Sequence, residues 1–163
     1  MARIELTTLI DAPLERCFDL ARSVDVHTRS TASTGEAAIG GKTSGLLDLD
    51  DEVTWRARHF GLWQTHTSRI TVFDRPGHFR DSMTRGAFRS FEHDHYFAAM
   101  KDGRTEMRDV LEFSAPLGPL GRLAERAILT RYLLGFLKER NRLLKEIAES
   151  NEPPSPQRKG GGG

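Results

Sequence analysis

Residues 10–20 read IDAPLERCFDL, and they mark a change from strand to helix. After them, apolar side chains recur at helical spacing, at Leu14, Cys17, Phe18 and Ala21. Asp11 is in position to cap such a helix, and Pro13 is tolerated in a first turn because its missing N–H has no intrahelical partner there. The stretch therefore predicts a strand that leads directly into a short amphipathic helix.

The segments on either side extend this pattern. Arg3–Ile10 alternates apolar and polar side chains, which is typical of a strand with one buried face. A second short helix is expected over Val24–Thr31, and the glycine-rich Gly35–Gly45 contains a short strand at Ala37–Ile39.

From Asp51 to Ala115 the chain has the pattern of an antiparallel meander. Turn residues separate its strands, at Gly61, Pro76-Gly77, Gly86 and Asp102-Gly103. The longest helical pattern then runs from Leu120 to about Ser150 and would measure roughly 45 Å. The tail Asn151–Gly163 is rich in proline and glycine and is expected to be a disordered extension.

This order of elements is that of an α+β protein with a single domain over residues 1–150. We expect a curved antiparallel sheet of about six or seven strands wrapped around the long C-terminal helix, with two short helices after the first strand. Only one helix is long enough to cover the concave face of such a sheet. The space between them should therefore be a lined cavity.

Composition narrows the function classes. With 24 Lys and Arg against 23 Asp and Glu, the net charge of +1 gives no reason to expect a nucleic-acid partner. The sequence contains no run of about 20 apolar residues for membrane insertion and no secretory leader, so a cytoplasmic protein is expected. The lone Cys17 falls in an apolar helical stretch and is interpreted as an inert buried thiol. Ala127–Leu137 is apolar nearly all round, which leaves a monomer and a homodimer both open.

These features together resemble the SRPBCC superfamily of START-like helix-grip proteins, over residues 2–144. The opening Ile10–Leu20 is similar to its first strand-to-helix junction. Val53–Gly61, Phe79–Asp81, Phe91–Phe97 and Ala115–Gly118 resemble bacterial members described as polyketide cyclase/dehydrase-like or lipid-transport-like. The resemblance implies the fold and an internal cavity. It leaves the function open, because the superfamily includes carriers, cyclases, hydrolase-like enzymes and receptors.

Counting by twos places five polar residues on strand faces that are otherwise apolar, namely His59, Asp81, His93, His95 and Asp109. Their apolar companions on those faces include Trp55, Met83, Phe97 and Met107. His93 and His95 are two positions apart on one strand, so their Cα atoms should lie roughly 6.5–7 Å apart with both rings on the same side. We interpret these nine residues as the candidate ligand-binding site.

Three interpretations of the polar group remain open. It can be a structural network, because buried polar groups need partners. It can orient the polar end of a ligand in an apolar pocket. It can also carry chemistry, either an Asp–His acid/base pair or a His/His/Asp site for zinc or iron. No Cys-rich or His-Glu-x-x-His motif supports a metal site, and we expect neither a metal nor a cofactor.

The sequence thus predicts a protein that binds a small, largely apolar molecule, lipid-like, aromatic or polyketide-like. The alternative is a cyclase, dehydratase or hydrolase in which Asp81 or Asp109 orients a histidine base; no catalytic residue is assigned. His27, His66 and His78 are expected at the surface or at an edge.

Overall fold

The computed structural model describes residues 1–115 and 128–150. Its elements follow the predicted order, β1 (Ala2–Ile10), α1 (Leu14–Ala21), α2 (Val24–Ser30), the 3₁₀ turn η1 (Ala32–Thr34), β2 (Ala37–Gly41), β3 (Glu52–His59), β4 (Leu62–Asp74), β5 (His78–Arg85), β6 (Ser90–Ala99), β7 (Thr105–Ser114) and α4 (Thr130–Glu149). The α+β fold class and the two short helices after the first strand are confirmed. The predicted tail lies outside the described residues.

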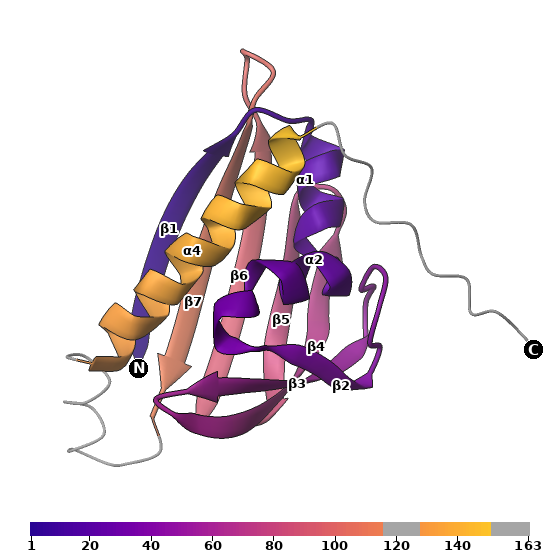
Figure 1. Cartoon of the computed structure of the whole chain (residues 1–163). Helices are drawn as coiled ribbons and strands as arrows, with labels where there is room; N and C mark the ends of the chain where they lie inside the picture. Colours follow the sequence, from indigo (N-terminus) through magenta and orange to yellow (C-terminus); the bar gives the residue numbers. More distant parts are fainter. Residues whose placement is uncertain (116–127, 151–163) are drawn as a thin grey trace, which may run out of the picture.

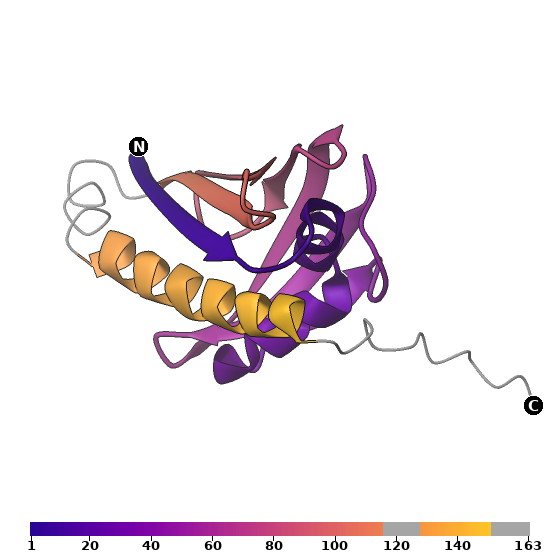
Figure 2. The same ribbon diagram turned by 90° about the horizontal axis from the view of Figure 1, so that it is seen from above.

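The seven strands form one antiparallel sheet in the order β1-β7-β6-β5-β4-β3-β2. The sheet bends so strongly that β2 and β3 run across the lower end of the view, whereas β6 and β7 run along its height in opposite directions (Figure 1). Seen from above, the sheet curls around the helices, and α4 lies along its open side (Figure 2). The register sets Asp81 opposite His93 and His95 opposite Asp109. Period-two counting therefore assigned these side chains to one face correctly.

The strand-to-helix junction differs from the prediction in one detail. The residue that precedes α1 in extended conformation is Pro13, and no side chain caps the helix. The predicted cap Asp11 lies too early in the chain. Its backbone N–H instead donates a hydrogen bond of 2.8 Å to Glu149 Oε1, near the end of α4. The prediction of Asp11 as an N-cap is therefore wrong, and the residue connects the junction to the C-terminal helix.

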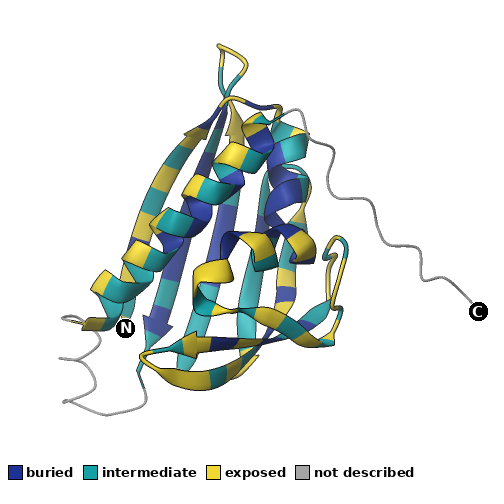
Figure 3. Cartoon of the chain, in the orientation of Figure 1, coloured by how far each residue is buried: buried dark blue, intermediate teal, exposed yellow. Residues whose placement is uncertain are grey.

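The long helix α4 packs along β1 and against α1 and α2. Its buried face includes Leu137, Leu144 and Ala148, and the colours of Figure 3 show that this face turns toward the sheet. The guanidinium of Arg16 donates to the carbonyls of Ala148, Ile147 and Ser150, which satisfies carbonyls in the last turn of α4. The predicted start of this helix, residues 120–127, lies outside the described residues. Among those described, no helix is long and apolar enough to cross a bilayer.

Phe18 of α1 is the centre of the main core. Its ring is fully buried and makes edge contacts with Phe73, Phe79 and Phe97 at centroid distances of 5.4–5.6 Å. The same cluster includes Met107. One end of the concave face is therefore filled by α1, and only the remainder is available to a ligand.

Replacing Phe18 with Ala removes this contact centre and leaves a void under α1. We expect the free energy of unfolding, measured by denaturant titration, to fall by about 3–5 kcal/mol. Leu49→Ala is the matched control, since Leu49 is 53% exposed and should change stability by no more than about 0.5 kcal/mol. Equal effects of the two substitutions would contradict this assignment of the core.

Candidate ligand-binding cavity

A cavity of about 320 Å³ lies between the sheet and α4, within the size range of small-molecule sites. Most of its wall is apolar. The apolar side chains come from strands, helices and loops, and include Trp55, Ala57, Ile70, Phe79, Leu111 and Phe136. The structure therefore has a cavity under the long helix, where the sequence led us to expect one.

Five of the nine predicted site residues line this cavity: Trp55, His59, Asp81, His93 and His95. The other four, Met83, Phe97, Met107 and Asp109, are not among its lining residues. Phe97 and Met107 belong to the core under α1. The sulfur of Met83 lies beside Gly86, and Asp109 is fully buried behind the two histidines. Strand parity identified the inward face in these cases. It could not tell which inward side chains are packed under other residues and which ones line the cavity.

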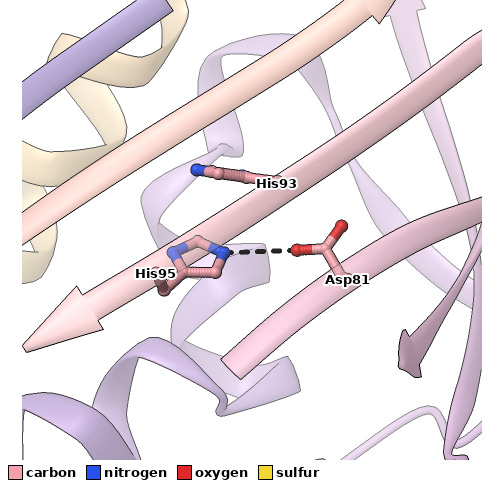
Figure 4. A group of neighbouring side chains, drawn as sticks. All are labelled: Asp81, His93 and His95. Atoms are coloured by element: carbon pink, nitrogen blue, oxygen red, sulfur yellow. Dashed lines mark hydrogen bonds and ion pairs between the residues drawn. The ribbon is translucent and has the colours of Figure 1, made fainter. Parts of the chain in front are cut away.

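The polar group, here called the Asp81 cluster, consists of Asp81, His93, His95 and Asp109. His93 Nε2 lies 2.9 Å from Asp109 Oδ1, and His95 Nε2 lies 3.2 Å from Asp81 Oδ2. The second ring nitrogen of His95, Nδ1, is 2.8 Å from Asp109 Oδ1. Figure 4 shows the two imidazoles side by side on β6, with Asp81 reaching toward His95 from β5. Both carboxylates thus converge on His95.

Because an ionised carboxylate only accepts hydrogen bonds, both Nε2 atoms must carry protons. Burial lowers the pKa of His93, and the charge of His95 adds to this effect. Burial also disfavours protonated His95, but the Asp109 carboxylate in close contact with Nδ1 and the hydrogen bond to Asp81 outweigh it and raise the pKa of His95. His95 is therefore the more readily protonated member of the pair, while His93 favours the neutral form, whose Nδ1 can act as an acceptor.

The same contacts shift the pKa values of the two aspartates. Burial alone would raise the pKa of Asp81, but the hydrogen bond from His95 and the histidine charges lower it to about 2. Burial likewise opposes ionisation of Asp109, and its bonds with His93 and His95 hold its pKa well below the ordinary value. Both aspartates are ionised at neutral pH.

The Asp81 cluster is also connected to α4. Asn141 Nδ2 donates to Asp109 Oδ2 at 2.7 Å and to Thr8 Oγ1 at 3.2 Å. Arg140 Nη1 lies 4.0 Å from Asp109 Oδ1 and donates to Asn141 Oδ1 at 3.1 Å. Arg140 and the protonated form of His95 therefore offset the negative charges of the two aspartates.

Asp81, His93 and His95 are also the residues that could hold a metal ion, since one donor atom of each lies within 4.8 Å of the others. Two imidazoles and a carboxylate form a donor set suited to zinc or iron. His95 is the least available ligand, because both of its ring nitrogens already lie near carboxylates. A metal there would have to displace the His95 proton.

A second polar group lines the cavity near α2. It contains His27 and Glu36, whose Nε2 and Oε2 atoms are 3.4 Å apart, and His59, whose Nδ1 is 2.6 Å from the Tyr132 hydroxyl. His66 of β4 also lines the cavity. Burial lowers the pKa values of His59 and His66, and it raises that of Tyr132.

The surface assignments of His27 and His66 are therefore wrong, whereas His78 lies away from the cavity and pairs with Asp94 at 2.7 Å. Signals for both cavity residues were present. His66 shares the strand parity of buried Ile70, and His27 follows buried Val24 at helical spacing. No sequence pattern marked Glu36, which lies between η1 and β2.

The sequence matches no family profile and no curated protein sequence. Solved structures do match the fold. The aromatase/cyclase ZhuI from Streptomyces sp. R1128 gives a TM-score of 0.73 at 14% identity, over 91% of this chain and 93% of that one. A START superfamily protein from Mycobacterium smegmatis gives 0.69 at 9% identity, over 90% and 97% of the two chains. The major latex-like protein 151 of Panax ginseng gives 0.68 at 13% identity, over 91% and 98%.

The protein thus has the helix-grip fold of the START/SRPBCC superfamily, as the sequence resemblance indicated. At these identities the likeness establishes the fold alone. One of these neighbours is named as an enzyme and the other two names state no activity, so the chemistry of the site has to be argued from its own residues.

Asp81→Asn should lower the pKa of His95, because it removes one of the two carboxylates that favour the protonated ring. NMR titration of the histidine rings should show His95 protonating at higher pH than His93 in the wild type, with a smaller difference in the variant. A group whose pKa is higher in the folded than in the unfolded protein stabilises the fold. This contribution is complete at pH values below the unfolded pKa of 6.5, and it is lost as the pH rises through the folded pKa.

The variant should therefore lose less stability above pH 6.5 than the wild type does. Glu92→Gln is the control, since Glu92 pairs with Arg80 rather than with either histidine. A His95 titration that is unchanged in Asp81→Asn would contradict the assigned contact.

Proposed function

We propose that this protein binds one small, largely apolar molecule, lipid-like, aromatic or polyketide-like, in the cavity between the sheet and α4. The observation that carries the proposal is an apolar cavity of about 320 Å³ with a compact polar group on its wall. Apolar surface supplies affinity, and a few polar groups orient the guest. Trp55 and Ala57 would contact its body.

The polar end of the ligand would meet His93 or Asp81. Neutral His93 offers an acceptor at Nδ1, while Asp81 accepts only one described hydrogen bond, from His95. A hydroxyl or other donor group on the ligand can donate a hydrogen bond to either of these acceptors. Met83, Phe97, Met107 and Asp109 would act indirectly, by supporting the wall.

Native mass spectrometry of the protein as extracted tests the proposal. A bound small molecule should appear as a one-to-one mass excess, and the same spectrum distinguishes a monomer from a homodimer and detects a metal. Ala57→Phe fills the cavity from β3 and should reduce the bound fraction by about tenfold, which corresponds to roughly 1.4 kcal/mol of binding free energy.

Ala98→Phe is the matched control, because Ala98 is exposed on β6 and enlarging it leaves the cavity unchanged. Thermal unfolding of both variants separates lost binding from lost folding. Undiminished ligand in folded Ala57→Phe would show that the molecule binds elsewhere, and the proposed function would fail.

Acid/base catalysis is the second candidate, in a cyclase, dehydratase or hydrolase reaction. His93 Nε2 donates to buried Asp109 at 2.9 Å, which orients the ring and leaves Nδ1 as a base on a cavity-lining side chain. The lowered pKa of His93 keeps that nitrogen unprotonated near neutral pH. The aromatase/cyclase among the structural neighbours is consistent with such chemistry on this fold.

If the molecule identified by mass spectrometry is transformed by the wild type, His93→Gln should slow its turnover by about 100-fold or more. Its affinity should change only a few-fold, because the cavity wall is retained. His78→Gln is the control, since His78 pairs with Asp94 away from the cavity. Unchanged turnover in His93→Gln would exclude His93 as the base.

A further inference from the structure

Glu36 is a carboxylate whose bonding is incomplete. Its side chain is 10% exposed, and its Oε2 atom is fully enclosed without a hydrogen bond from any residue that the structure describes. His27 Nε2 lies 3.4 Å away, a distance for charge attraction rather than for a good hydrogen bond. Buried carboxylates ordinarily accept several hydrogen bonds, so this group is left in need of a donor.

The carboxylate is nevertheless held in its charged form. Burial opposes ionisation, but the nearby charge of His27, together with side-chain contacts from His27 and Thr31, outweighs it and lowers the pKa of Glu36. Glu36 therefore places a negative carboxylate, with one oxygen short of a donor, in a cavity wall that also includes Trp55.

The position of Glu36 is determined by three elements. Gly35, at φ 63°, ends η1 in the left-handed conformation and turns the chain into β2 directly after Glu36. His27 comes from α2 and lies on the Trp55 ring at a centroid distance of 4.3 Å. These contacts hold the carboxylate at the cavity wall, so it does not extend freely into solvent.

Glu36 lines the same cavity as three members of the Asp81 cluster, namely Asp81, His93 and His95, and comes from a different part of the chain. His66 lies close enough to both carboxylates for its pKa to be affected by each. A guest in this space therefore meets two separate acceptors, one at Asp81 and one at Glu36, with apolar surface around them.

We propose that Glu36 anchors a hydrogen-bond donor, an ammonium or a hydroxyl, on the apolar ligand. This inference rests on the proposed binding function and specifies its ligand class. The guest is an apolar body with a donor at the Glu36 end, and an anionic end is disfavoured there. His27 is a positioning residue for the carboxylate.

The test uses naphthalene compounds that share one substitution position and differ in the end group: ethylnaphthalene, naphthylethanol and naphthylethylamine. Dissociation constants are measured by calorimetry on the full chain. We expect the wild type to bind the alcohol or the amine about tenfold or more tightly than ethylnaphthalene, which is the range of one well-made hydrogen bond to a charged group.

Two substitutions distinguish the donors. Glu36→Gln keeps an acceptor oxygen but removes the charge, so it should abolish a preference for the amine and retain part of a preference for the alcohol. Glu36→Leu should abolish both preferences. Affinity for ethylnaphthalene should stay within a few-fold in either variant, and Glu112→Gln, outside the cavity and paired with Arg3, should behave as wild type.

The outcomes separate the two proposals. If ethylnaphthalene and its analogues all fail to bind the wild type, the proposed function is overturned, and this inference with it. If they bind but the relative affinities are unchanged in Glu36→Gln and Glu36→Leu, only this inference is overturned. In that case Glu36 serves the structure through His27, and the variants should lose thermal stability without a change in selectivity.

Discussion

The burial of Asp109 is the constraint on which the rest of the interior depends. An ionised carboxylate without partners is very costly in a protein core, and removing one member of a buried charge pair typically costs about 3–5 kcal/mol. Here the partners come from two other elements, the imidazoles of His93 and His95 on β6 and the amide of Asn141 on α4. The charge can be satisfied only when α4 lies at one position along the sheet. The network therefore sets the helix register and presents two oriented imidazoles to the cavity.

The same arrangement divides the concave face in two. Phe18 of α1 fills one end with closely packed aromatic rings, and Leu144 and Ala148 of α4 complete that core. Toward its N-terminal half, α4 instead contributes Phe136 and Leu137 to the cavity wall. A single helix thus closes a solid core at one end and a binding space at the other, because only one end of the sheet also receives α1.

Much of the fold could be predicted because it depends on local periodicity. Alternation along β5 and β6 placed Asp81, His93 and His95 on one face, and the antiparallel register then brought them together. The errors have physical causes. The helix start depends on backbone conformation at Pro13, which moved the expected cap away from Asp11. The cavity position of His66, wrongly predicted to be at the surface, follows from its shared strand parity with Ile70.

By itself the sequence determined which side of each strand faces inward, since successive side chains must alternate across a sheet. It did not determine what lies above each inward residue. Only the tertiary structure decided that Phe97 is core while His93 lines a cavity, because that depends on how far α1 reaches along the concave face. The placement of Glu36 was likewise a tertiary outcome. Its surroundings come from α2, η1 and β3, which no local pattern relates to one another.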